Sequence, residues 1–465
     1  MFSAFANTLK VKELRGKLLV ALGIIALCRL AANIPCPGID SHALKLYFEK
    51  NSQMTSSFMG MFDLFSGGAM HQFAVATLGI MPYISASIIM QLLIPVMPSL
   101  EKMAREGDVG RQKITQYTRY LTVIICLVQG SMAAMAMMNP QRLGLPAPDQ
   151  NFPLILHPGT PFVLMTVIML TCGTMLLMWL GEQITKYGIG NGASIIITIG
   201  IVSRMPQAFY SLYDMAASGS TFSGQRFKGV QALILMLLFV LVTAATIALT
   251  QAQRRIPIQM AKKIVGFNKM KGGSTYMPLK VNFSGVMPII FASAILMFPS
   301  MVLQWIPNLL PESMSSASDF FRYLSRFFVY GTSGYLFIYG LLVVLFSYFW
   351  VANQFNPLQI SENLKKEGAY VPGIRPGKPT AEFLDNTMTR ITLAGALFLT
   401  GLALFPMLLT KGLNINHMVT SFFGGTSLLI IVGVMLDTLS QMESHLLMRN
   451  YDGFLKKGKL RSRRR

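Results

Sequence analysis

Charge is the first thing that this sequence lacks. Only 13% of its 465 residues are charged, whereas 52% are hydrophobic, and the mean hydropathy is +0.50. A soluble domain of this length exposes far more charge, because about a quarter of the residues in an average soluble chain are charged. The scarcity of charge therefore excludes an ordinary soluble globular protein and favours a membrane protein.

Motifs for catalysis and metal binding are also lacking. The four cysteines, Cys28, Cys36, Cys126 and Cys172, show no C-x-x-C spacing, so neither a disulfide framework nor a metal site is supported. The five histidines are scattered, and neither H-E-x-x-H nor G-x-S-x-G occurs. The glycines in 188–192 follow no strand and have the wrong spacing for a dinucleotide fingerprint. We therefore expect no catalytic residues, no metal and no cofactor.

What the chain has instead is long apolar runs. About 20 apolar residues suffice to cross a ~30 Å hydrocarbon core as a helix. The first run has no small-residue cleavage site after it, so we interpret it as a retained span rather than a signal peptide. The sequence predicts an all-α polytopic membrane protein with ten transmembrane helices, at approximately 19–34, 79–94, 120–138, 161–181, 189–203, 229–250, 285–302, 331–351, 391–410 and 420–436.

The basic residues orient these spans. With a cytoplasmic N-terminus, 30 of the 40 Lys and Arg residues lie in cytoplasmic segments, nine lie on the opposite side, and Arg29 lies within a span. This asymmetry is a strong positive-inside signal, and an even number of spans places both termini in the cytoplasm. Residues 1–18 are typical of a basic amphipathic leader on the membrane surface, and 441–465 form a basic cytoplasmic tail.

One twelve-residue stretch occurs twice. GIMPYISASIIM (Gly79–Met90) is repeated 206 positions later as GVMPIIFASAIL (Gly285–Leu296), with seven identical positions. The copies lie five spans apart and so cross the membrane in opposite directions. We infer two inverted five-helix halves, 19–215 and 216–440, around a central pore, because inverted repeats place the functional path between the halves.

Three further segments do not fit simple spans. Residues 58–78 are apolar but carry Asp63, His71 and Gly67-Gly68, so the segment is either a re-entrant stretch buried at membrane depth or an outer loop. The alternating pattern and Gly pair in the cytoplasmic loop 251–284 predict a β-hairpin. In the second long cytoplasmic loop, 352–390, the prolines and glycines of GIRPGKPT fix the backbone and leave Arg375 and Lys378 projecting.

Three function classes compete for such a chain. Secondary transporters share the inverted repeats, but they usually keep ionisable residues at the midplane for coupling. Here the spans hold essentially one charge, Arg29. An intramembrane enzyme needs a nucleophile or a metal set, for which we find no pattern. A passive channel fits best, and without charge in its path it must be gated by an apolar constriction.

Several long motifs also resemble one family. MFDLFSGGA (Met61–Ala69), GIGNGASIII (Gly188–Ile197), PLKVNFSGVMP (Pro278–Pro288), NLKKEGAYVPGIRPG (Asn363–Gly377) and FGGTSLLIIV (Phe423–Val432), together with Thr77–Ile88, are similar to the SecY/Sec61-alpha family. The resemblance runs in order over nearly the whole chain. It implies a protein-conducting channel that translocates unfolded secretory chains and releases hydrophobic segments sideways into lipid.

The resemblance also implies roles for particular residues. It implies a pore ring of Ile80, Ile84, Ile197, Ile290 and Ile430. From the residues alone, ordinary packing is the favoured interpretation of these isoleucines, and the resemblance reverses it. It implies a plug at about 58–72, centred on Phe62, Asp63, Leu64, Phe65, Ser66, Gly67 and Gly68, and a lateral gate flanked by Ser87, Gln91 and Ser293.

The two cytoplasmic loops match the family's docking surface for the motor ATPase SecA and the ribosome. The docking residues implied are Arg254, Arg255, Lys262, Lys263, Lys269, Lys271, Arg375 and Lys378. Positive-inside bias explains part of this charge, but seven bases and no acid in 251–284 exceed what topology needs. The tip of that loop departs from the common bacterial pattern. The resemblance further implies the small subunits SecE and SecG, signal peptides and nascent chains as ligands, and a bacterial inner-membrane location.

Overall fold

The structure is a computed structural model that describes most of the chain. It describes residues 11–50, 65–138, 154–155, 157–218, 221–222, 225–226, 229–260, 264–265, 268–269, 274–309, 315–328, 332–413 and 426–457. Three predicted plug residues (Phe62, Asp63 and Leu64) and three predicted docking residues (Lys262, Lys263 and Lys271) lie outside these ranges.

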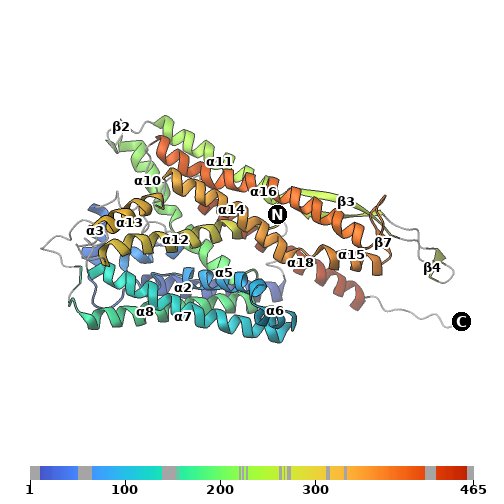
Figure 1. The fold of residues 1–465 in the computed structure, drawn as a ribbon, viewed down its shortest axis with the longest axis horizontal. Coiled ribbons are helices and arrows are strands. Elements are labelled where there is room, and N and C mark those ends of the chain that lie inside the picture. The colour runs from blue at the N-terminus through green and yellow to red at the C-terminus, as the bar shows by residue number, and fades with distance from the viewer. Residues whose placement is uncertain are drawn as a thin grey trace. The chain divides into compact units, whose positions relative to one another are not determined.

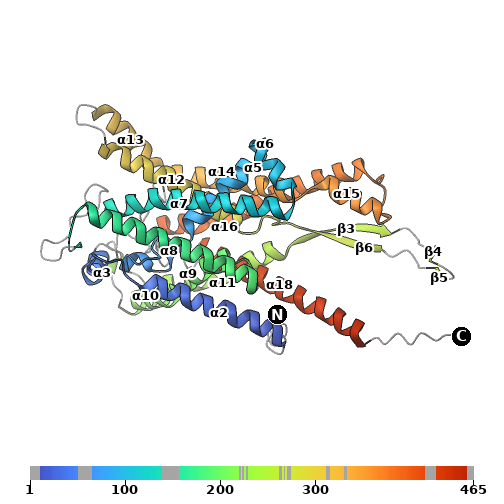
Figure 2. The ribbon, with the colours of Figure 1, turned by 90° about the horizontal axis from the view of Figure 1, so that it is seen from below.

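The described chain is mostly helical (Figures 1 and 2). Its helices are α2 (Lys12–Asn33), α3 (Ser41–Lys50), the 3-10 helix η2 (Ala69–Gln72), α5 (Met81–Val96), α6 (Pro98–Arg105), α7 (Asp108–Met138), α8 (Thr160–Tyr187), α9 (Gly192–Ser203), α10 (Met205–Ser218), α11 (Gly229–Gln251), α12 (Met287–Leu309), α13 (Ser315–Phe327), α14 (Ser333–Gln354), α15 (Pro357–Lys366), α16 (Lys378–Leu413) and α18 (Thr426–Lys457). Its strands are β1 (Thr221–Phe222), β2 (Gln225–Arg226), β3 (Gln253–Met260), β4 (Ile264–Val265), β5 (Asn268–Lys269), β6 (Ser274–Lys280) and β7 (Ala369–Tyr370).

Each predicted span overlaps one of these helices in the part of the chain that the structure describes. Among the described residues, seven helices are long and apolar enough to cross a membrane, and the pair of α5 and α6, bent by 99° at Met97, is an eighth candidate. The helices that carry the first and seventh predicted spans, α2 and α12, do not pass that test over their described residues, so the count of ten stays a prediction. The chain is a multi-pass membrane protein.

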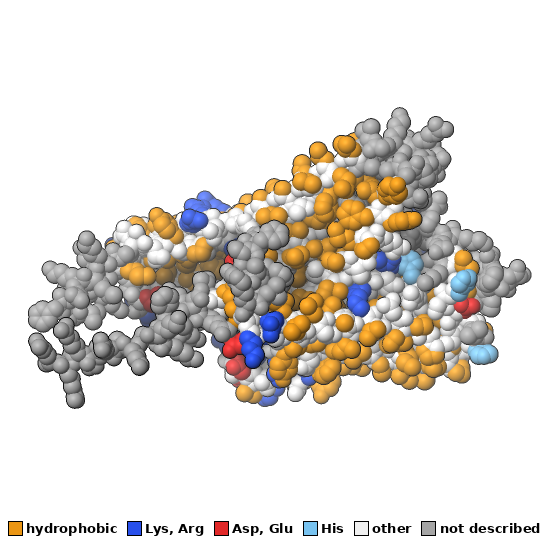
Figure 3. All heavy atoms as spheres, turned by 180° about the vertical axis from the view of Figure 1, so that it is seen from behind, with side chains coloured by type: hydrophobic (Ala, Val, Ile, Leu, Met, Phe, Trp, Pro, Cys, Tyr) orange, Lys and Arg blue, Asp and Glu red, His pale blue; other side chains and the backbone are white. Residues whose placement is uncertain are grey.

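On the face seen in Figure 3, hydrophobic side chains cover much of the described surface. On α11, for example, Leu233, Leu237 and Val240 are each about two-thirds exposed. A water-soluble protein rarely leaves apolar patches of this extent uncovered, whereas hydrocarbon solvates them without cost.

The chain divides into two units, which we describe separately. One comprises Met1–Tyr210 with Val434–Arg465, and the other comprises Ser211–Gly433. In the first unit α7 and α8 lie side by side along most of their length (Figures 1 and 2).

The described part of the predicted leader, from residue 11, leads directly into α2. Residues 12–18 belong to the same helix as the first span, so no break separates leader from span at residue 18. Leu14 is buried in a small cluster with Ile189 and Met442. The start of this helix is therefore held by protein contacts, which the apolar run alone could not reveal.

The predicted hairpin in 251–284 is confirmed. β3 and β6 pair antiparallel from Gln253–Lys280 to Gln259–Ser274. The other long loop adds a third strand, because β7 pairs with the far end of β3 at Gln259–Tyr370 and Met260–Ala369. The two loops thus share one sheet, in the order β6-β3-β7.

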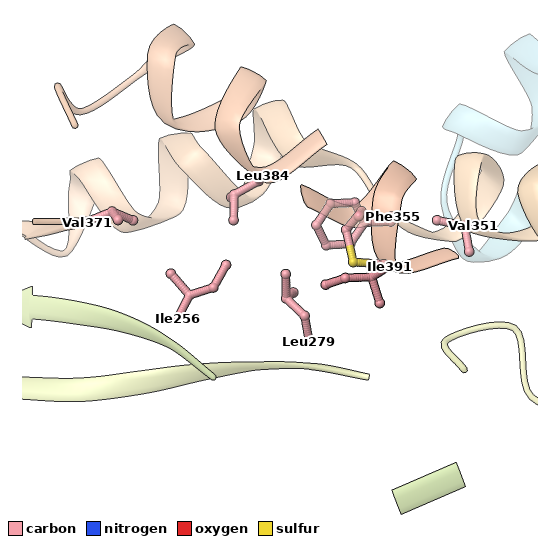
Figure 4. Packing of buried hydrophobic residues seen from close by; sticks show 8 residues of the cluster. Ile256, Leu279, Val351, Phe355, Val371, Leu384 and Ile391 are labelled. Atoms are coloured by element: carbon pink, nitrogen blue, oxygen red, sulfur yellow. The ribbon is translucent and has the colours of Figure 1, made fainter. Parts of the chain in front are cut away.

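A hydrophobic cluster fastens this sheet to the helices beside it (Figure 4). Ile256 and Leu279 project from the strands toward Leu384 and Phe355, and these four side chains are at most 8% exposed. Val351, Val371, Met388 and Ile391 complete the cluster. We call the sheet together with α15, the loop that follows β7 and the start of α16 the platform.

Candidate functional site

The two copies of the repeated stretch have the same local structure. Gly79 and Gly285 both adopt a left-handed backbone, with φ of 60° and 62°, and each precedes a helix that starts with Met-Pro. In both copies an early helical bond spans the same positions, from Ile84 N–H to the Ile80 carbonyl and from Ile290 N–H to the Val286 carbonyl. Pro near the start of each helix removes an N–H that has no helical partner there.

The matching geometry extends beyond the twelve residues. The N–H of Val75 donates to the carbonyl of Ile34 at 2.9 Å, and the N–H of Val281, 206 positions later, donates to that of Ala252 at the same distance. A glycine lies against the carbonyl of each valine, Gly173 of α8 in one unit and Gly395 of α16 in the other. A side chain at either glycine would collide with that carbonyl. Each unit therefore enters its copy of the motif by the same path, which supports a duplication.

All five predicted ring isoleucines are buried, each at most 7% exposed. Ile80, Ile84 and Ile197 belong to one unit, and Ile290 and Ile430 belong to the other. Ile80 lies near Gly181 of α8, where an added Cβ would be 3.5 Å from its Cδ1 atom. Burial of this kind is common to a closed constriction and to ordinary packing.

The three predicted gate side chains bond within their own helices. The Gln91 amide donates to the Ser87 hydroxyl at 3.2 Å, one turn along α5. The Ser293 hydroxyl donates to the carbonyl of Ile290 at 2.8 Å on α12. These bonds satisfy polar groups that would otherwise be costly in a membrane, and each is weak enough to exchange for another partner.

The described part of the predicted plug has a defined seat. Gly67 and Gly68 are both left-handed, with φ of 65° and 95°. Gly67 packs against Gly200 of α9 so closely that a Cβ on Gly67 would lie 2.8 Å from the Gly200 Cα. Phe65 and Ser66, just before the glycines, are 7% exposed. Only glycine meets both the backbone angle and the close approach.

Two arginines flank the glycine pair. The Arg29 guanidinium of α2 donates to the Gly67 carbonyl at 3.3 Å and to the Ser203 hydroxyl at 2.9 Å. The Arg204 guanidinium lies beside Gly68, where an added Cβ would be 3.2 Å from its Nε atom. We call Arg29, Gly200, Ser203 and Arg204 the seat. Gly200 follows Ile197 by about one turn of α9, so a ring residue and the seat share one helix.

The basic residues of the platform are exposed. Arg254 and Arg255 lie on β3 with outward side chains, and Arg375 and Lys378 lie on the loop before and at the start of α16. Hydrogen bonds fix that loop: the Ser361 hydroxyl donates to the Gly377 carbonyl at 2.6 Å, and the Thr380 hydroxyl donates to the Arg375 carbonyl at 2.8 Å. The prediction that this loop projects its two basic side chains is consistent with this geometry. Lys269 lies in β5, where only the backbone is described.

Comparison with known proteins identifies the family. The family model for SecY matches residues 74–439. The protein translocase subunit SecY of Chlamydia trachomatis serovar D is 42% identical over 459 residues, which cover 97% of this chain and 98% of that protein. The chain belongs to the SecY family. The SecY proteins of Thermotoga maritima and Haemophilus influenzae are 40% and 39% identical, over 100% and 97% of this chain and 100% and 95% of those proteins.

The fold of this chain is similar to the fold of solved SecY and Sec61 channel structures. A protein-conducting channel superposes with a TM-score of 0.60 at 16% identity, covering 96% of this chain and 95% of that one. A SecY structure concerned with the plug domain gives a TM-score of 0.59 at 17% identity over the same shares. Sec61 in a canine ribosome–channel complex gives 0.56 at 16% identity, again over 96% and 95%.

Sequence reasoning found the SecY segments but missed how they are held. Arg29 stood out as the one charge within a span, and an intramembrane charge marks a functional site by default. Its acceptors, the Gly67 carbonyl and the Ser203 hydroxyl, are 38 and 174 residues away, so no local pattern could name them. The union of the two loops in one sheet was likewise missed, because β7 has only two residues.

Proposed function

We propose that this chain is a protein-conducting channel that translocates unfolded secretory polypeptides across the membrane and releases hydrophobic segments sideways into it. The observation that carries the proposal is the pair of motif copies, which share a left-handed glycine and the same early helical bond, in a chain that matches SecY over nearly its full length. Inverted repeats place a conducting path at the interface between halves. The channel is not an enzyme and needs no cofactor.

The pore ring consists of Ile80, Ile84, Ile197, Ile290 and Ile430. Branched apolar side chains close around a passing chain without binding it, and they repel hydrated ions by dewetting. This proposal is supported by the origin of the five residues in both units, and their burial is compatible with it. A polypeptide in extended form passes, whereas small ions meet an apolar constriction.

The segment at about 58–72 is the plug that closes the resting pore. The proposal is supported by the packing of residues 65–68 on α9 one turn from Ile197, and by the hydrogen bond from Arg29. A charge-assisted hydrogen bond contributes about 1.5–3 kcal/mol, so the plug is held firmly but releasably. Release requires that the Gly67 carbonyl exchange its partners for water and that residues 65–68 leave their packing on α9.

The helices of the two motif copies, α5 and α12, flank the lateral gate, with Ser87, Gln91 and Ser293 along the seam. Polar contacts in a membrane are worth about 0.6–2 kcal/mol each, so an apolar signal sequence can open such a gate. Cysteines at Ser87 and Ser293 are expected to form a disulfide that stops export. A control pair, at Ser87 and the lipid-facing Leu341, is expected to leave export intact. If no α5/α12 pair can be crosslinked, the gate assignment fails.

The platform is the docking surface for the partners that supply the energy of transport. A passive channel must be driven from outside, and we propose SecA and the translating ribosome as partners that recognise the basic side chains. The pairing of β7 with β3 joins the two loops in one platform that carries Arg254, Arg255, Arg375 and Lys378, which supports a single docking surface. Positive charge suits both rRNA and acidic protein patches. SecE and SecG complete the membrane complex in the bacterial inner membrane, with both termini of this chain cytoplasmic.

Depletion of the protein tests the function directly. Cells that lose it are expected to accumulate signal-bearing precursors in the cytoplasm, and re-expression should clear them. If the precursors are still exported, a secondary transporter becomes the better explanation, since that class shares the inverted repeats.

A further inference from the structure

Helix α13 (Ser315–Phe327) differs in character from every span of its unit. It lies between α12 and α14 in the sequence and contacts both. Hydrophobic residues recur at Phe320, Tyr323, Leu324 and Phe327, the spacing of one helix face. The opposite face carries Asp319, Arg322, Ser325 and Arg326. With 13 residues the helix is too short to cross a membrane.

The packing of α13 leaves an aromatic strip uncovered. Phe321 and Leu324 are half-buried, whereas Phe320 and Tyr323 are 60% and 61% exposed and Phe327 is 43% exposed. The exposed rings contact only neighbours on their own helix among the ring pairs of the described chain: Phe320 meets Phe321 at 5.8 Å, and Tyr323 meets Phe327 at 5.5 Å between centroids. Burying a large apolar side chain is worth about 1.5–3 kcal/mol, so three such rings in water would be costly.

This strip adjoins a surface that lipid covers. The ring of Phe327 reaches the first turn of α14, where a Cβ on Gly334 would lie 2.6 Å from it. On α14, Phe337, Leu341 and Leu345 recur every four residues and are 72%, 51% and 50% exposed. A stripe of this kind on a candidate span faces hydrocarbon. The aromatic strip therefore stands at the end of a lipid-facing stripe, where hydrocarbon gives way to headgroups.

The charged side chains next to the strip also favour contact with lipid. Arg322 and Arg326 are exposed, and the nearest acid, Asp319, pairs with Arg322 only at 3.9 Å on the surface, where ion pairs contribute little. Guanidinium groups bind phosphate with two parallel hydrogen bonds, and Tyr prefers the membrane–water boundary. Exposed arginines and a tyrosine beside the lipid-facing α14 therefore favour lipid headgroups over a protein partner.

We propose that α13 lies in the headgroup layer of the membrane as an interfacial anchor. Phe320, Tyr323 and Phe327 enter the acyl boundary, and Arg322 and Arg326 bind lipid phosphates. Amphipathic helices with basic polar faces and aromatic apolar faces bind membranes in this way. The anchor holds the adjoining ends of α12 and α14 at a fixed depth in the membrane, whatever the channel conducts.

Depth measurement on the full chain tests the anchor. Bimane is attached to single cysteines introduced in a Cys172→Ser background. The test positions are Phe320 and Tyr323, and the matched control on the charged face is Arg322. Cys172 is the one exposed native cysteine, and the other three are buried. The complex is reconstituted into vesicles of phosphatidylethanolamine and phosphatidylglycerol that contain lipid brominated near the top of the acyl chain. A label at Phe337 sets the lipid-facing reference.

We expect labels at Phe320 and Tyr323 to be quenched as strongly as the label at Phe337, and the label at Arg322 to be quenched by aqueous iodide instead. Iodide quenching of all three α13 labels would overturn the proposal, because the strip would then face water. Protection of Phe320 and Tyr323 from both quenchers would also overturn it, because a protein would then cover them. Arg322→Gln with Arg326→Gln should reduce the bromolipid quenching at Tyr323. Unchanged quenching would refute the phosphate contacts.

Discussion

Replacing Gly200 with alanine perturbs the plug seat and leaves its backbone in place. Gly200 lies inside α9, and a Cβ there would be 2.8 Å from the Phe65 carbonyl oxygen and 3.6 Å from an Nη atom of Arg29. The gain in helix propensity, about 1 kcal/mol, is the same whether the plug is seated or released, so it cancels. The collision exists only in the seated state and costs about 1–3 kcal/mol, as overpacking usually does. We therefore expect the released state to gain about 5- to 150-fold in population.

A matched control separates this effect from a general change in helix stability. Gly23 is also inside a helix of the same unit, α2, and a Cβ on it would meet nothing within 4 Å. Gly23→Ala therefore brings the same propensity gain with no collision.

Two readouts report the seated fraction. One is the export of a precursor with a defective signal sequence, and the other is the ion leak of the purified channel in proteoliposomes. Gly200→Ala should raise both, and Gly23→Ala should behave as the unaltered protein. Equal behaviour of the two variants, with both inserted normally, would show that the contact between the plug and α9 does not hold the channel closed.

Three further predictions follow from the seat and the platform. Arg29→Gln removes the charge-assisted bond to Gly67, worth about 1.5–3 kcal/mol, so it should also raise the ion leak; a leak no higher than that of the unaltered protein would contradict the role of Arg29. Leu384→Ala empties part of the cluster beneath the sheet at a cost of about 2–5 kcal/mol, so limited proteolysis should cut the β3–β6 hairpin faster; an unchanged cutting rate would show that the cluster does not hold the sheet. Arg375→Glu reverses an exposed charge on the platform, so it should block export in vesicles while the protein still inserts; normal export would remove Arg375 from the docking surface. In the same assay Lys102→Glu, which reverses an exposed charge on α6 outside the platform, should have a smaller effect.

The sequence predicted the helices well because hydrocarbon imposes a simple rule. Backbone polar groups must bond within the segment, so a long apolar run has to be helix. It predicted helix ends poorly, because water and headgroups impose no such rule: α7 extends back to Asp108, well before the predicted span at 120. The β3–β6 hairpin was predictable from local alternation and a Gly pair. The pairing of β3 with β7 was not, since two strand residues carry no period.

The functional residues divide in the same way. The motif copies were found because a duplication leaves identical letters at a fixed offset. Their shared left-handed glycines then explain why those letters include Gly79 and Gly285. The roles of the isoleucines came from resemblance, because an apolar side chain in a pore and one in a core look alike in sequence. The seat was out of reach, because it depends on the close approach of Gly67 to Gly200 in space.

The central claim is that a polypeptide passes the ring of isoleucines. A precursor stalled in transit, with one cysteine in the segment that is crossing, can report its neighbours by disulfide formation with single cysteines at Ile84 or Ile290. We predict adducts at both positions, and none at Leu345 on the lipid-facing side of α14. Adducts at Leu345 without any at Ile84 or Ile290 would contradict the account.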